Sequence, residues 1–259
     1  MRKLIITVLL AALALGLCAC GSSKTQETQD QATQDSAAAH ESIKAASTYV
    51  ESVIDTGEMS SSVQDDANGV YRYWTYSGKE ANDEFSLEIE IDGKKITLAD
   101  TTSSDLKDLG FECDADVETV KPNTVQGIIM KKGDKSCNIS VQNATNQEQD
   151  IQDLPVFQVN VFSDESNLGF NYGGIKGGST LEEVIKAFGT PKSNVTAAAN
   201  ESGNTITLNY FNASTQDDLL TTSTLDIELL YNAEKNSATV RSINLSSYRE
   251  KVKQPTTAE

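Results

Sequence analysis

The chain contains little histidine, cysteine and positive charge, and each shortage excludes a class of function. Its only histidine is His40, so a Ser-His-Asp or Cys-His site elsewhere in the chain would have no imidazole base. Lysine and arginine number 21 against 38 acidic residues, which gives a net charge of −17. Nucleic-acid binding requires clustered basic side chains, so no DNA or RNA partner is expected. Electrostatics instead favours basic proteins or cations as partners.

A long apolar run occurs only at the amino terminus. The apolar stretch 4–17 follows two basic residues and is shorter than a membrane span of ~20 residues. It ends in Leu17, Cys18, Ala19 and Cys20. This pattern is typical of a bacterial lipoprotein signal peptide, here 1–19, with Cys20 becoming the lipidated amino terminus. Cys18 is the alternative site, but the residue before it is bulky where the peptidase requires a small side chain.

This signal predicts the location of the protein. We expect a lipid anchor at Cys20 to hold it on the outer face of the cell membrane, in a bacterium that is Gram-positive. Removing 1–19 leaves 19 basic and 38 acidic residues, a net charge of −19. Such a surface suits solubility beside an anionic cell wall.

The other two cysteines are predicted to form a disulfide. Cys113 and Cys137 make an even pair in a compartment that does not reduce disulfides. Closing this loop would stabilise the fold by about 3 kcal/mol. The alternative is two buried thiols. A metal site is not expected, because no histidine and no further cysteine lies nearby to complete a ligand set.

Composition predicts a tether before the folded part. Residues 20–69 are rich in polar side chains, and we expect a lipid-anchored polar tether there. Apolar residues at helical spacing predict a short amphipathic helix over 43–54, followed by a polar break at 60–68. At the other end, 249–259 is expected to be a disordered tail.

The first folded unit is predicted over 70–165. Alternating side chains in 85–91, then Asp92-Gly93 and a returning run at 95–98, predict a β-hairpin. Thr102 and Ser103 can cap a short helix that Gly110 ends. A second hairpin over 128–131 and 139–141 and a strand in 156–162 complete the unit.

The second folded unit is predicted over 166–248. Ser179 and Glu182 match a capping box, and the helix that follows carries an apolar stripe, Leu181, Val184, Ile185 and Phe188. Gly189 and Pro191 end that helix. Strands are predicted over 205–211, 225–231 and 239–245. The fold class is therefore α+β, with two small units, each an antiparallel sheet with a short helix on one face.

The second unit resembles a known module. The run from Ile175 to Val184, closing with Phe188-Gly189-Thr190-Pro191 and followed by short strands, is similar to the helix-plus-sheet module of the β-lactamase-inhibitor-protein-like and outer-membrane assembly lipoprotein (SmpA/OmlA) superfamily, over about 170–247. The run from Ile91 to Phe111 is similar to a domain of unassigned function in exported lipoproteins of Firmicutes. The resemblance implies an α+β binding scaffold without catalysis. In the inhibitor proteins, two tandem modules grip a protein on a concave sheet.

A group of aromatic residues is the candidate interaction surface. Tyr71 and Tyr73 share one face of a predicted strand, and Trp74 and Tyr76 share the other. Both faces of a small sheet cannot be equally buried, so one pair is a candidate for contact with a protein or a glycan. The alternative is that these rings cover the edge of the core.

We therefore expect a surface lipoprotein that binds an envelope or extracellular protein, with no enzyme activity, cofactor or metal. The alternative is an envelope enzyme that cuts cell-wall polymers with paired carboxylates. Its candidates are Asp114, Asp116, Glu118, Asp217 and Asp218. They do not match a calcium loop, and the glycines 173–178 do not match a phosphate loop. A transporter's solute-capture component is a third hypothesis, disfavoured because two small units leave no pair of lobes around a cleft.

Overall fold

The computed structural model describes residues 24–78, 82–200, 203–216 and 219–251. Internal contacts divide the chain after Asp35, and residues from Ser36 onward form one compact unit. All packing described below lies within that unit. The signal peptide, Cys18 and Cys20 lie outside the described residues, as do Asp217, Asp218 and 252–259.

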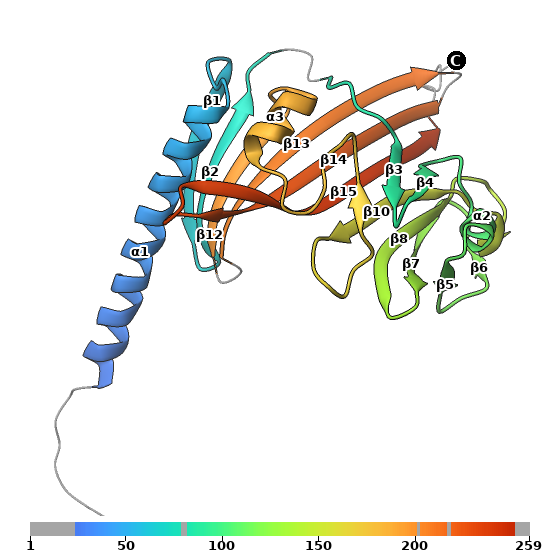
Figure 1. Cartoon of the computed structure of the whole chain (residues 1–259), viewed down its shortest axis with the longest axis horizontal. Coiled ribbons are helices and arrows are strands. Elements are labelled where there is room, and N and C mark those ends of the chain that lie inside the picture. Colours follow the sequence, from blue (N-terminus) through green and yellow to red (C-terminus); the bar gives the residue numbers. More distant parts are fainter. Residues whose placement is uncertain (1–23, 79–81, 201–202, 217–218, 252–259) are drawn as a thin grey trace, which may run out of the picture. The chain divides into compact units, whose positions relative to one another are not determined.

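Antiparallel strands make up most of the described chain (Figure 1). The helices are α1 (Lys24–Val53), α2 (Ser103–Asp108), α3 (Leu181–Phe188) and the 3-10 turn η1 (Ile151–Asp153). The strands are β1 (Met59–Asp66), β2 (Gly69–Tyr76), β3 (Glu88–Ile91), β4 (Lys94–Thr97), β5 (Glu112–Asp114), β6 (Thr119–Val120), β7 (Thr124–Lys132), β8 (Lys135–Asn143), β9 (Gln149–Asp150), β10 (Val156–Phe162), β11 (Phe170–Asn171), β12 (Asn194–Asn200), β13 (Gly203–Gln216), β14 (Leu219–Asn232) and β15 (Ser237–Lys251).

One ten-stranded sheet dominates the fold. Its order is β1-β2-β12-β13-β14-β15-β10-β8-β7-β5, and smaller sheets are formed by β11-β3-β4 and by β6-β9. β10 pairs with β15, and β2 pairs with β12, so strands from both predicted units share this sheet. The prediction of two separate small units is therefore not confirmed, whereas the antiparallel sheets and short helices are present.

The sheet order contains a repeat of topology. α2 is followed by β5, β7, β8 and β10, which are neighbours in that order, and α3 is followed by β12, β13, β14 and β15, also in order. The last strand of each set, β10 and β15, joins the two sets. Both helices begin with a capping box, at Thr102 with Asp105 and at Thr180 with Glu183. Two halves that are not evident copies in sequence thus follow one plan.

Local sequence signals explain most elements of these halves. Asp92 and Gly93 have φ of 47° and 75°, the left-handed conformation that the tight turn between β3 and β4 requires. The predicted helix over the apolar stripe is α3, and Gly189 ends it with φ of 77°. The capping box is one residue later than predicted, because Thr180 caps the helix and the Ser179 hydroxyl accepts the Lys176 N–H instead.

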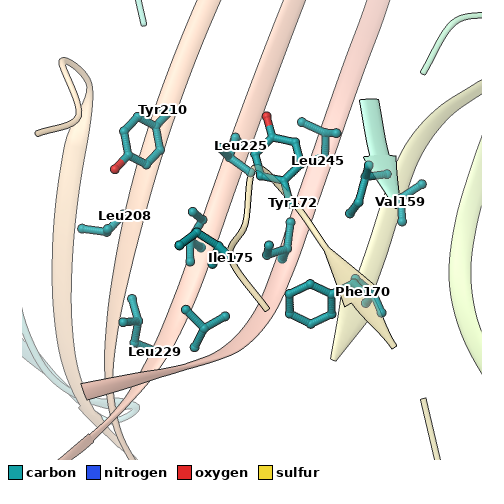
Figure 2. Close-up of a cluster of buried hydrophobic side chains, with 14 of the residues drawn as sticks. Val159, Phe170, Tyr172, Ile175, Leu208, Tyr210, Leu225, Leu229 and Leu245 are labelled. Atoms are coloured by element: carbon teal, nitrogen blue, oxygen red, sulfur yellow. The ribbon is translucent and has the colours of Figure 1, made fainter. Parts of the chain in front are cut away.

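One face of the ten-stranded sheet carries the main core. Leu208, Tyr210, Leu225 and Leu245 project from it against Phe170, Tyr172 and Ile175, which come from β11 and the loop after it (Figure 2). Phe188 of α3 lies 5.3 Å from the Tyr172 ring and 5.9 Å from the Tyr210 ring, measured between ring centroids. Burial of these side chains away from water holds α3 and the small sheet on this face.

The prediction of a polar tether over 20–69 is wrong for most of its described length. α1 occupies 24–53, and β1 forms where a polar break was expected. Alanine, glutamine, glutamate and lysine are strong helix formers, so a polar segment with few large apolar residues still forms a helix. The apolar stripe predicted over 43–54 is buried except for the half-buried Val53, with Ala46 and Val50 fully covered. Likewise, the prediction of a disordered tail is wrong for 249–251, which belong to β15, and the rest of that predicted tail lies outside the described residues.

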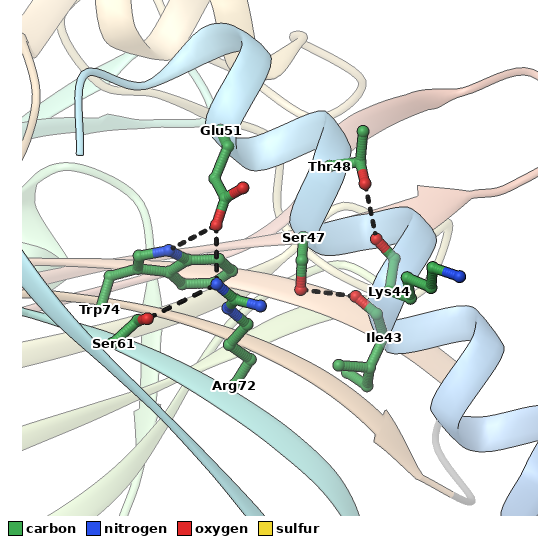
Figure 3. Close-up of polar contacts among 8 residues, drawn as sticks. All are labelled: Ile43, Lys44, Ser47, Thr48, Glu51, Ser61, Arg72 and Trp74. Atoms are coloured by element: carbon green, nitrogen blue, oxygen red, sulfur yellow. Dashed lines mark hydrogen bonds and ion pairs between the residues drawn. The ribbon is translucent and has the colours of Figure 1, made fainter. Parts of the chain in front are cut away.

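α1 is attached to the same face of the sheet through polar contacts (Figure 3). The Glu51 carboxylate accepts a hydrogen bond of 3.3 Å from the Trp74 indole N–H and one of 2.8 Å from the Arg72 guanidinium. That guanidinium lies 5.1 Å from the centroid of the Trp74 ring. Tyr49 stacks on Tyr231 with ring centroids 5.5 Å apart. The helix therefore belongs to the folded unit from Ser36 onward.

Candidate functional site

The ten-stranded sheet has a second face, which we call the open face. Side chains alternate along each strand, so the residues between the core positions project to this opposite side. The contacts of α1 and α3 described above involve the core face. On β12, β13, β14 and β15, the open face includes Asn194, Thr196, Ala198, Thr205, Thr207, Asn209, Phe211, Thr222, Thr224, Asp226, Glu228, Leu230, Ser242, Asn244, Ser246 and Tyr248. Hydroxyl, amide and carboxylate groups dominate this surface.

A row of asparagine and aspartate crosses the open face, and we call it the Asn/Asp row. Its members occupy directly opposed positions on six neighbouring strands: Asn194, Asn209, Asp226, Asn244, Asn160 and Asn138. Asparagine and aspartate are depleted in β-strands because their side chains compete for backbone hydrogen bonds. Their alignment over six strands therefore calls for a reason other than strand stability.

Hydrogen bonds connect the members of this row. The Asp226 carboxylate accepts from the amide of Asn209 and, at 3.3 Å, from the amide of Asn244. Asn244 in turn accepts a 2.9 Å bond from the Gln158 amide, and Gln158 accepts from the Ser140 hydroxyl at 3.4 Å. These contacts fix the orientation of the amides. Each amide retains further donor or acceptor capacity that a bound partner can use.

Large apolar side chains also gather on the open face. The described residues include six large apolar side chains that are exposed, and four of them project from this face: Val125, Ile129, Leu230 and Tyr248. The Tyr248 ring forms an edge contact with Phe157 at 6.3 Å. Exposed aromatic and aliphatic groups around hydrogen-bonding side chains are characteristic of interaction surfaces.

The four aromatic residues singled out from the sequence divide between the two faces. Trp74 is fully buried beneath α1, on the core face, and Tyr76 projects to the same side. Tyr71 and Tyr73 project from the open face, where their rings stack with centroids 6.3 Å apart. The strand alternation of the prediction is therefore present. Whether Tyr71 and Tyr73 contact a partner stays a prediction.

The predicted disulfide is wrong, because both cysteines are free thiols. Cys113 on β5 and Cys137 on β8 each lie opposite Met130 of β7, which separates them. Two strand spacings place their Cα atoms about 10 Å apart, whereas a disulfide requires about 4.4–6.8 Å. Burial raises the pKa of the Cys113 thiol and raises that of Cys137 to about 12, so both remain protonated.

The described residues also line hollows away from the Asn/Asp row, and one of about 300 Å³ lies between Asp55, Met59, Tyr76 and Lys192, among others. Two more lie elsewhere. A pocket of about 320 Å³ beside α2 is lined by Ser103, Cys113, Glu118 and Asp150, among others. A shallow hollow of about 580 Å³ lies over the glycine-rich loop 173–178 and one side of α3. Neither is lined by a histidine. Among the described residues, no group of three or more His, Cys, Asp or Glu side chains is arranged to hold a metal ion.

Three carboxylates of the alternative enzyme hypothesis are described by the structure, and all three are exposed to water. Asp114 pairs with Lys131 at 2.6 Å, and Asp116 and Glu118 are exposed. Asp217 and Asp218 lie outside the described residues. A general acid that cuts glycosidic bonds works from apolar surroundings that keep it protonated. His40, the single imidazole, bonds the Asp65 carboxylate at 2.9 Å on the exposed surface.

The Asn/Asp row is the candidate site that sequence reasoning missed. Its six residues lie far apart along the chain, and no local pattern connects them. Only the register of the sheet aligns them.

Comparisons with family models, with curated proteins and with solved structures find no match to this chain. None of the helices within the described ranges is long and apolar enough to cross a membrane.

Proposed function

We propose that this chain is a non-catalytic binding module of the cell envelope that holds a partner protein on the open face. In this proposal Cys20 carries a lipid that anchors the chain outside the membrane. The observation that carries the proposal is the Asn/Asp row, flanked by exposed apolar side chains on the sheet face opposite α1 and α3. Asparagine and aspartate are unfavourable in β-strands, so their alignment on six strands is explained if their side chains bind a partner.

The chemistry of the open face indicates the kind of partner. Asp226 is the one carboxylate in the row, and its hydrogen-bond partners are neutral amides. Glu228, two residues further along the same strand and on the same face, forms an ion pair with Arg241 at 3.4 Å. Together with a net charge of −19 after cleavage, this favours a partner protein that presents basic and hydrogen-bond-donating side chains to Asp226.

The repeated topology supports the same proposal. Two sets of one helix and four strands form one continuous sheet, joined through β10 and β15. The resemblance of the second half to the inhibitor-protein module leads one to expect two tandem units that bind a protein on a sheet surface. The shared plan of the two halves agrees with that expectation.

Site-specific photo-crosslinking on intact cells tests the proposal. A photoreactive amino acid at Ile129 or Tyr248 samples the open face, and one at Thr48, exposed on α1, is the matched control. We expect both open-face positions to capture the same protein and Thr48 not to capture it. That protein, once purified, should bind the wild-type chain at least about tenfold more tightly than Asp226→Asn, with an affinity that falls as salt is added.

Two results would overturn the proposal. One is equal capture from the open face and from Thr48. The other is binding of isolated cell-wall glycan, and of no protein, by the wild-type chain, with loss of that binding in Asp226→Asn. The second result would assign the open face to a polysaccharide.

A further inference from the structure

The first strand of the ten-stranded sheet, β1, has an unpaired edge. All eight of its residues pair with β2 in continuous register, from Met59 opposite Tyr76 to Asp66 opposite Gly69. No other described strand pairs with β1. Seven of its eight residues are exposed. Such an edge presents a row of free N–H and C=O groups to another strand.

A backbone hydrogen bond at the start of β1 shows which of its N–H and C=O groups point away from β2. The Ser77 N–H donates to the Glu58 carbonyl at 3.0 Å, so this directly opposed pair is a hydrogen-bonded one. Hydrogen-bonded and non-hydrogen-bonded pairs alternate in an antiparallel ladder. Ser60, Ser62 and Gln64 therefore bond to β2. The intervening Ser61, Val63 and Asp65 direct their N–H and C=O groups away from the sheet.

The backbone on the far side of β2 confirms this alternation. The Tyr76 N–H donates to the Ser193 carbonyl of the chain entering β12, at 2.9 Å. Tyr76 therefore bonds toward β12 and not toward β1. Its opposite residue on β1, Met59, belongs with the outward-pointing set, as the alternation requires.

This edge has few of the features by which proteins usually block strand pairing. β1 contains no lysine, arginine or proline, and its register with β2 has no bulge. Val63 at its centre is 57 % exposed, the largest value among the exposed large apolar side chains of the described residues. Acidic residues occur at one end only, as Asp65 and Asp66. The edge is thus suited to pairing with another strand. Because its acidic residues lie at one end, the direction of the added strand decides how close that strand's own charges come to them.

We infer that β1 pairs with β1 of a second copy of this chain, antiparallel and centred on Val63. In this register the two Val63 residues face each other, and each Ser61 faces Asp65 of the other copy. Six main-chain hydrogen bonds then satisfy the outward groups of Ser61, Val63 and Asp65. The two Val63 side chains lie on the same side and cover each other.

The distribution of charge explains why a second copy suits this edge. Antiparallel pairing separates the two Asp65 carboxylates by four residues along the strands, about 14 Å. This exceeds the Debye length of about 8 Å at physiological salt, so their repulsion is largely screened. A parallel arrangement in direct register would instead bring the acidic ends together. The two-fold axis stands perpendicular to the sheet, so the open faces of both copies lie on one side and become continuous.

Analytical ultracentrifugation of the mature chain with Cys20→Ser, which prevents acylation, tests this pairing. We expect a concentration-dependent dimer. Val63→Pro removes the outward N–H without removing a bond to β2, so it should raise the dimer dissociation constant at least about tenfold. Val63→Thr keeps the N–H and the β-branched shape and is the matched control, expected to dimerise as the parent does.

Cysteine cross-linking tests the register separately. In the same Cys20→Ser chain, Val63→Cys should form a disulfide-linked dimer under mild oxidation, whereas Ser61→Cys should not, because its own counterpart lies four residues away along the strands. This comparison remains decisive even where Val63→Pro fails to fold. A chain that stays monomeric at its highest soluble concentration, or cross-linking at Ser61 in place of Val63, overturns the inference. Neither result affects the proposed use of the open face.

Discussion

Replacing Tyr49 with phenylalanine tests whether α1 is part of the folded unit. The Tyr49 hydroxyl donates to the Glu182 carboxylate of α3 at 3.0 Å and accepts from the Ala238 N–H of β15 at 3.4 Å. It therefore links α1 to two elements far away in the sequence. Burial, together with the Glu182 charge, raises the pKa of Tyr49 to about 12, so the hydroxyl stays protonated at neutral pH.

The magnitude follows from what the phenylalanine leaves behind. Ala238 is fully buried, and an unpaired buried N–H costs about 1–3 kcal/mol. The bond to Glu182 adds less, because that carboxylate is exposed to water. The stacking on Tyr231 survives, since phenylalanine keeps the ring. We therefore expect Tyr49→Phe to lower the free energy of unfolding by about 2 kcal/mol.

The assay is urea unfolding of a chain that begins at residue 20 and carries Cys20→Ser, monitored by circular dichroism. The control is Tyr73→Phe on the open face, for which we expect a change within about 0.5 kcal/mol. A second comparison uses Glu182→Gln, alone and combined with Tyr49→Phe, to measure the coupling between the two side chains. If Tyr49→Phe also changes stability by less than about 0.5 kcal/mol, α1 is not held as described, and its attachment to the sheet would have to be abandoned.

Two further predictions concern the cysteines. A chain that begins at residue 20 and carries Cys20→Ser, denatured without reductant, should react with a thiol reagent at two positions, Cys113 and Cys137; finding no reactive thiol would show that a disulfide exists. The second concerns pH. Burial raises the pKa of Cys137 to about 12 in the folded chain, whereas in the unfolded chain it is 9.0. The contribution of Cys137 to the free energy of unfolding is therefore full below pH 9 and is lost as the pH rises above 9. Between pH 9 and 10 the Cys137 thiol should lower the free energy of unfolding by up to about 1.4 kcal/mol per pH unit. Urea denaturation at several pH values measures this slope. If Cys137→Ala shows the same slope as the parent chain, the pH dependence does not come from Cys137.

Several local elements could be predicted because their signals lie within a few residues. Asp92-Gly93 formed the expected hairpin turn, Thr102 capped α2, and Gly189 ended α3. Each of these depends on a backbone conformation or a capping bond that neighbouring residues determine. The spacing of Leu181 and Val184 likewise predicted a buried helix face, since one side of a helix repeats every three to four residues.

Other elements could not be recognised from local patterns. β1 is exposed along nearly its whole length, so no apolar alternation distinguishes it from a polar linker. β12 places Ala197 and Ala199 at core positions, where large apolar residues would have revealed a strand. The sequence likewise gives no measure of how far α1 extends, because strong helix formers continue a helix without an apolar stripe.

The candidate site shows the same division. The sequence by itself determined the composition of the protein: an acidic chain with one histidine, a lipoprotein-type amino terminus, and strands with polar residues between apolar ones. Only the tertiary structure decided that strands from both halves share one sheet, that Met130 separates Cys113 from Cys137, and that the Asn/Asp row forms. The physical reason is that cross-strand register depends on hydrogen bonds between distant segments, which no local pattern encodes.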